Sequence, residues 1–291
     1  MTNTIDYSSL AIEFGGEAFE GDSGVKTPYC QAVRGFGAKD TLKAGLFIPE
    51  SQIPAAQWVS EPPAKNRMTY IFGEENPTEQ VGYLFTSPRL LVTPKTPILA
   101  VSRQPNKETG FRDVLGLYNA ETKTPDIQNQ RTYLIYFLSE DNKLLHLIPY
   151  KINARGAFGA SFGQTFSSFC SEFNLAFTEA INTKLRALGQ PPMPLKGKND
   201  MFNCLLAFCP TFGREKAGKG NVQSMACKVV SYIKPTAENA LNMFAGSDDD
   251  LKVHVIAMTA PMTQLNLLPP EKTEQELLAA GNAAADDINP W

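Results

Sequence analysis

The side chains in this sequence that could do chemistry are aromatic rings interleaved with lysines and arginines, on segments that read as strands and loops. Cations that follow phosphates and rings that stack on bases are the contacts that hold single-stranded nucleic acid, at about 1–3 kcal/mol for each stacked base. The same residue types also fill cores and solvated faces, so this alternative stays open. The candidate nucleic-acid-binding residues are Arg34, Trp58, Arg67, Tyr70, Phe72, Tyr83, Phe85, Arg89, Arg103, Arg214, Lys216 and Lys219.

The stretch GREKAGKGN, residues 213–221, is the most specific part of this pattern. It holds three cations within six residues and lies between two strand-like runs. It does not match a nucleotide-binding loop, which would lie between a strand and a helix. We expect it to be the exposed tip of a basic hairpin, which either clamps a strand of nucleic acid or is a solubilising turn.

Most catalytic constellations are missing from the sequence. The two histidines, His146 and His254, lie in apolar runs that predict strands, and neither has a recognisable motif beside it. We find no Walker-type phosphate loop, no Rossmann fingerprint and no G-x-S-x-G motif. We therefore predict a protein that is not an enzyme and that needs no cofactor.

Three cysteines and one acidic run are the candidate metal ligands. Cys204, Cys209 and Cys227 lie on or beside predicted strands without an evident fourth ligand, so we expect buried core thiols and no zinc. The run SDDD, residues 247–250, lacks the glycine-punctuated ligand spacing of a calcium loop. We expect a solvated loop there and no metal site.

The acidic charge of the chain is concentrated near its end. The net formal charge is −3, and from Glu271 onward five acids against one lysine give −4, which leaves +1 for the preceding 270 residues. Five cysteines, an odd count, favour reduced thiols. The first residues do not resemble a secretory signal, and no apolar run approaches the ~20 residues of a membrane span. We expect a cytoplasmic protein without membrane contact.

The elements that would position these residues are mainly short strands. Runs at 25–36, 44–49, 68–73, 80–94, 97–104 and 251–261 predict strands, and 132–152 predicts a hairpin that turns at SEDN. A second hairpin is predicted around the 213–221 loop. Phenylalanines at steps of three and four predict an amphipathic helix over 163–189, and 235–246 predicts a short helix.

This pattern predicts an α+β fold with mainly antiparallel strands, one long amphipathic helix and a disordered acidic C-terminal tail. Strands broken by Gly and Pro suit an OB-like, partly open barrel. We expect a flexible arm over 1–24 and a globular body over 25–267, with a Pro-rich link near 190–200 that could divide it. A disordered linker and an acidic tip would follow over 268–291.

The last eight residues, AADDINPW, end the chain on Asp286, Asp287, Ile288, Pro290 and Trp291. This end resembles the C-terminal tip of bacterial single-stranded DNA-binding proteins, where an acid-rich linker finishes with several Asp, then Ile, Pro and Phe. Trp291 stands in for the Phe, and Asn289 is inserted before Pro290. The resemblance covers only these residues. It implies partners among replication, recombination and repair proteins, and a tip that competes with DNA for the protein's own basic groove.

Together these observations predict a single-stranded DNA-binding protein of low sequence specificity that recruits replication and repair proteins through its tip. The alternative is a non-enzymatic structural or adaptor protein, of a phage or plasmid type, that docks on a host protein without binding DNA. An enzyme is the third reading, and it would need His146 or His254 beside a cysteine or an acid in a pocket.

Overall fold

Antiparallel strands and one long helix make up most of the structure, a computed structural model that describes residues 27–35, 43–72, 77–107, 112–218 and 223–259. The predicted α+β class is confirmed, because every strand pair within the sheets is antiparallel. The predicted arm over 1–24 and the linker and tip over 268–291 lie outside the described residues.

The first sheet has the strand order β1-β2-β4-β3. Its strands are β1 (Gln31–Val33), β2 (Gly45–Pro49), β3 (Arg67–Phe72) and β4 (Thr78–Phe85), with η2 (Glu50–Gln52), α2 (Ile53–Ala56) and η3 (Ala64–Asn66) between β2 and β3. Side chains along β2 alternate, so Leu46 and Ile48 join the main core whereas Phe47 belongs to a separate, smaller cluster. The sheet therefore has two apolar faces.

The second sheet is built around β8 (Ile127–Phe137), which pairs with three other strands. Its neighbours are β5 (Leu90–Pro94), β6 (Leu99–Ser102) and β9 (Tyr150–Arg155), and β7 (Val114–Leu117) pairs with β6. The predicted 132–152 hairpin is found in part: β8 pairs with β9, from Ile135 opposite Tyr150 to Gln130 opposite Arg155, but the residues between SEDN and Tyr150 form no regular strand. The chain turns near SEDN as predicted, where the Ser139 N–H donates to the Lys143 carbonyl at 2.9 Å.

The long helix α3 (Gly156–Ala187) starts seven residues before its predicted start. Gly156 has a φ of +53°, which lets the chain turn directly from β9 into the helix. The buried side of α3 carries three of the predicted phenylalanines, Phe166, Phe169 and Phe173. The four-residue spacing continues back through Phe162 and Phe158, both buried, and the prediction stopped short of these two residues.

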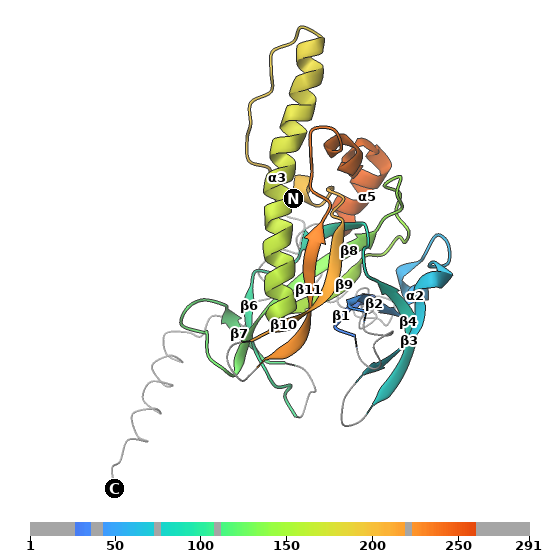
Figure 1. Cartoon of the computed structure of the whole chain (residues 1–291), viewed down its shortest axis with the longest axis vertical. Helices are drawn as coiled ribbons and strands as arrows, with labels where there is room; N and C mark the ends of the chain where they lie inside the picture. Colours follow the sequence, from blue (N-terminus) through green and yellow to red (C-terminus); the bar gives the residue numbers. More distant parts are fainter. Residues whose placement is uncertain (1–26, 36–42, 73–76, 108–111, 219–222, 260–291) are drawn as a thin grey trace, which may run out of the picture.

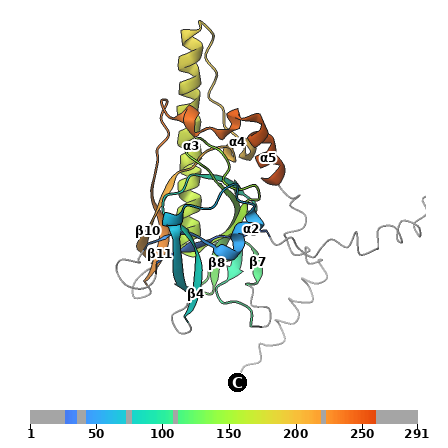
Figure 2. The same ribbon diagram turned by 90° about the vertical axis from the view of Figure 1, so that its right-hand side faces the viewer.

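The upper part of α3 projects beyond the sheets in both views (Figures 1 and 2). The Pro-rich link runs back along it and is attached by asparagine side chains. Asn182 exchanges two hydrogen bonds with the backbone of Met193, at 3.0 and 2.6 Å, and Asn174 donates to the Lys196 carbonyl at 3.0 Å. The link is therefore fastened to the helix.

Strands β10 (Pro210–Ala217) and β11 (Ser224–Tyr232) form a separate two-stranded ribbon that packs on α3. The prediction that 213–221 is a loop was wrong for its first part, because β10 continues through Ala217. Arg214 and Lys216 therefore lie on a strand. Lys219 lies outside the described residues.

The remaining elements are short: α4 (Asp200–Asn203), η4 (Ala240–Met243), η5 (Ala245–Ser247) and α5 (Asp249–Thr259). Two predictions are corrected here. The 251–261 strand is the helix α5, because Asp248 accepts the Leu251 N–H at 3.0 Å and two acids occupy the first turn. The short helix at 235–246 consists of two 3-10 turns.

One large core joins the sheets, α3 and the ribbon. Isolated bridges connect the sheets further, between Tyr29 and Lys151 and between Leu90 and Phe208. The OB-like barrel stays a prediction, since the pairing divides the described strands among three sheets. Among the helices of the described residues, none has both the length and the apolarity needed to cross a membrane.

Candidate nucleic-acid interface

The second apolar face of the first sheet carries a small group of aromatic rings. Tyr70 and Phe72 alternate along β3 and lie with their ring centroids 4.6 Å apart. Phe47 on β2 contacts both, at 5.6 and 5.8 Å. Phe47 and Tyr70 are buried, whereas Phe72 at the end of β3 is half-buried. Phe72 is therefore the ring of this group that is most open to a ligand.

Two arginines from distant segments approach this aromatic group. Arg34 follows β1, and its Nη1 donates to the carbonyl of Met225 on β11 at 3.3 Å. Arg214 lies on β10 opposite Cys227, and the next residue on the same face, Lys216, lies opposite Met225. Within the described residues, the Nε of Arg214 is buried and has no hydrogen-bond acceptor. A buried guanidinium N–H without an acceptor is costly.

The side chain of Tyr70 lies near both the aromatic rings and the two arginines. Burial raises its pKa, while a backbone hydrogen bond with Gly35 and the charges of Arg34 and Arg214 act in the opposite direction. The structure thus brings together four predicted residues, Arg34, Tyr70, Phe72 and Arg214, which we call the basic–aromatic cluster. Its two arginines are 180 residues apart in the sequence, and only the fold makes them neighbours.

Three other predicted stacking residues lie in the main core. Tyr83 and Phe85 are buried, and the half-buried Trp58 stacks on Phe85 with centroids 6.2 Å apart. The Nε1–H of Trp58 donates to the Tyr150 hydroxyl at 2.7 Å. These rings are packed against protein, so they are corrected from base-stacking candidates to core residues.

Three predicted cations are held by protein groups. Arg67 forms an exposed ion pair with Glu50 at 3.2 Å, which raises the pKa of the guanidinium. Arg103 is exposed, and its Nε donates to the carbonyl of Pro125 at 2.7 Å. Arg89 joins distant loops, with bonds of 2.8 Å to the Asn142 side chain and 2.7 Å to the Asn242 carbonyl. Arg89 therefore has a structural role. None of these three arginines belongs to the basic–aromatic cluster.

The predicted partner-binding residues Asp286, Asp287, Ile288, Pro290 and Trp291 lie outside the described residues. Their role therefore stays a prediction.

Both histidines bond to backbone carbonyls. His146 is fully buried; it accepts the Phe137 N–H on Nε2 at 2.9 Å, so the proton is on Nδ1, which bonds to the Ile148 carbonyl at 2.8 Å. His254 lies on α5, and its Nε2 is 2.8 Å from the Leu147 carbonyl. The strands predicted for the two histidines are corrected, because neither residue lies in a regular strand.

All five cysteines lie in the described part of the chain and are free thiols. Cys204, Cys209 and Cys227 are buried, as predicted. Burial raises the pKa of Cys227 to about 12, so its thiol stays protonated at neutral pH.

The charge of the described residues is distinctly positive. They hold twenty-three lysines and arginines against sixteen aspartates and glutamates, a net formal charge of +7. The other residues hold four cations and fourteen acids, which gives −10 and restores the total of −3. The +1 of the first 270 residues includes the five acids and one lysine of residues 1–26, and residues 27–259 alone hold twenty-five cations and twenty acids, a net formal charge of +5.

Comparison with known proteins places the chain in a family. The family model described as "Domain of unknown function (DUF5895)" matches residues 25–277. The chain belongs to this family. It is also similar to "Uncharacterized protein 254L" of Invertebrate iridescent virus 6, with 27% identity over 279 residues that cover 82% of this chain and 78% of that relative. No solved structure matches the chain. The matched range contains the basic–aromatic cluster and ends before the tip.

Proposed function

We propose that the protein binds single-stranded DNA with low sequence specificity through the basic–aromatic cluster. The observation that carries this proposal is the meeting of Arg34 and Arg214 with Tyr70 and Phe72 on one face of the first sheet. Guanidinium groups bind phosphate oxygens, and an aromatic face stacks on any base. These two contacts together hold a strand without reading its sequence.

The roles of the four residues follow from their burial. Phe72, at the end of β3, supplies the ring for a base, and Tyr70 supports that ring from behind. Arg214 adds positive charge beside Tyr70. Lys216, which is exposed on the same face of β10, extends the cationic surface along the ribbon. A phosphate of the strand would lie near the exposed Lys216.

The distribution of charge supports the same proposal. Residues 27–259 carry a net formal charge of +5, which attracts a polyanion, whereas residues 1–26 and 260–291 each hold five acids and one lysine. We propose that the tip, Asp286 to Trp291, binds replication or repair proteins: a partner pocket takes the terminal ring, and basic residues take the acids. We place this activity in the cytoplasm, where five thiols stay reduced, and we propose no catalytic step or cofactor.

Removing one exposed cation from the ribbon tests the proposal. We expect Lys216→Ala to weaken binding of a fluorescent oligo-dT about tenfold, because one phosphate contact is lost. The slope of log K against log salt is expected to become shallower by about 0.7. Fluorescence anisotropy at several salt concentrations measures both quantities.

The matched control is Lys184→Ala, which removes an exposed cation from the last turn of α3, far from the ribbon (Figure 1). It should bind as the wild type does. An equal loss of affinity in both variants would mean that the effect comes from the overall charge of the protein, and it would contradict the proposed site. If the wild-type protein binds neither single strands, duplex nor RNA, the adaptor function replaces this proposal.

A further inference from the structure

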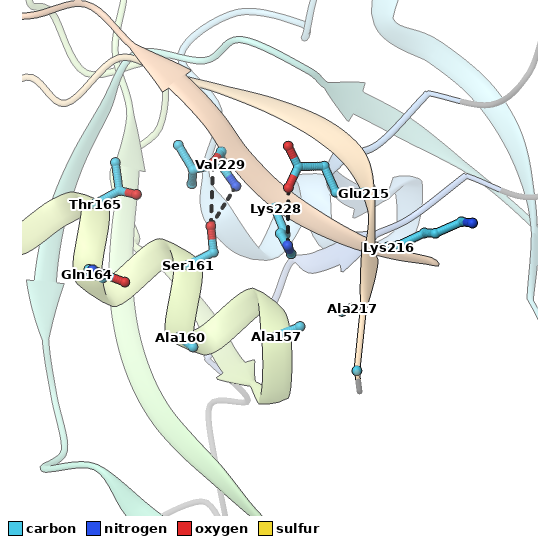
Figure 3. A pocket seen from close by; sticks show the side chains of 11 residues that line it. Ala157, Ala160, Ser161, Gln164, Thr165, Glu215, Lys216, Ala217, Lys228 and Val229 are labelled. Carbon is cyan, nitrogen blue, oxygen red and sulfur yellow. Dashed lines mark hydrogen bonds and ion pairs between the residues drawn. The ribbon is translucent and has the colours of Figure 1, made fainter. Parts of the chain in front are cut away.

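A cleft of about 490 Å³ lies between the first turns of α3 and the β10–β11 ribbon (Figure 3). On the helix side its wall is formed by small side chains, among them Ala157, Ala160 and Ser161. Gln164 and Thr165 continue that wall with an amide and a hydroxyl. The volume lies within the ~300–1,000 Å³ that small-molecule sites occupy. The small side chains leave the space open, and the polar ones offer hydrogen bonds.

The ribbon side of the cleft carries a cation in a fixed position. Lys228 on β11 forms an ion pair with Glu215 on β10 at 3.1 Å, and its ammonium lies between the ribbon and the start of α3 (Figure 3). The hydroxyl of Ser161 accepts the Val229 N–H at 3.1 Å and joins the two walls. Lys216 extends away from the helix in the same view. The Ser161–Val229 hydrogen bond thus closes one side of the cleft, and the ion pair with Glu215 fixes the ammonium group of Lys228 beside it.

We infer that this cleft is a subsite for one nucleotide of a bound single strand, with Lys228 serving a phosphate. The inference rests on the proposed function and adds a second contact to it. Strand alternation puts Arg214 and Lys216 on one face of the ribbon and Lys228 on the other. The strand therefore contacts both faces of the β10–β11 ribbon, with Gln164 and Thr165 beside the base or sugar in the cleft.

Filling the cleft without changing the charge tests the inference. Ala160 is exposed on α3, so Ala160→Trp places a large ring in the cleft and removes no ion pair. We expect it to bind oligo-dT about tenfold more weakly than the wild type, because one nucleotide loses its place. Ala187→Trp, the same substitution at an exposed site at the other end of α3, should bind as the wild type does.

A second variant tests the same inference in case Ala160→Trp fails to fold. Glu215→Gln combined with Lys228→Gln leaves the net charge unchanged and removes the ammonium. It should also weaken binding several-fold, with a salt slope shallower by about 0.7. Wild-type affinity in both cleft variants, with Lys216→Ala weakened, would overturn the cleft inference and leave the proposed function standing. Absence of binding by the wild-type protein would overturn both.

Discussion

Replacing Phe208 by alanine is expected to lower the free energy of unfolding by about 3–5 kcal/mol, the range for deleting a buried aromatic ring. Phe208 is fully buried, and its ring centroid lies 5.0 Å from that of Phe169 and 5.5 Å from that of Phe166, both on α3. Its backbone exchanges two 2.8 Å hydrogen bonds with Leu90 on β5. The residue thus joins the helix to the second sheet, and chemical denaturation measures the loss.

The control for Phe208→Ala is Leu175→Ala on the exposed side of α3, where the leucine side chain is 57% exposed. We expect that change to alter the free energy of unfolding by less than about 0.5 kcal/mol. If the two variants lost similar amounts of stability, the aromatic cluster around Phe208 would not be the centre of the core.

Lowering the pH from about 6.5 to about 4 is expected to reduce the free energy of unfolding through His146. Burial lowers the pKa of His146 to about 4, against 6.5 for an ordinary histidine. Between these values the unfolded chain binds a proton that the folded protein excludes, so stability falls as the pH falls. The contribution of this one group is roughly 3 kcal/mol over the whole window, at about 1.4 kcal/mol per pH unit.

The variant His146→Gln separates the contribution of His146 to the pH dependence of stability from that of the other titrating groups. A glutamine oxygen can accept the Phe137 N–H that His146 now accepts, but the side chain does not titrate. The variant is expected to be less stable at pH 7, with a weaker dependence of stability on pH between 6.5 and 4. Equal dependence in the two proteins would contradict the account, because it would mean that His146 takes up its proton in the folded state.

The regular parts of the fold could be predicted because periodic side chains carry them. The spacing from Phe166 to Phe177 indicates α3, and the aromatic and apolar run from Tyr133 to Phe137 indicates β8. Periodicity failed where a local contact decides the structure. The run 251–259 alternates like a strand, yet the Asp248 cap and the acids after it make it a helix. The start of α3 depends on the positive φ of Gly156, and the spacing of apolar residues does not indicate a backbone angle.

The candidate site was only partly predictable, because residue type does not reveal which way a ring or a cation faces. Tyr70 and Phe85 have similar sequence surroundings, but they lie in different apolar clusters on either side of the first sheet. The role of Arg89 depends on Asn142 and Asn242, far away in the sequence. Lys228 was missed, although alternation along β11 from the predicted core residue Cys227 would have placed it on the opposite face.

The central claim is that the body binds single-stranded DNA and that the tip is a separate recruitment element. The most direct test is a titration of fluorescent oligo-dT with the full-length protein and with a version lacking residues 284–291, at low and moderate salt. The account predicts binding that weakens steeply with salt and that survives or tightens when the tip is removed. No binding by either form at low salt, with duplex DNA and RNA also unbound, would contradict it and direct attention to the protein that receives Trp291.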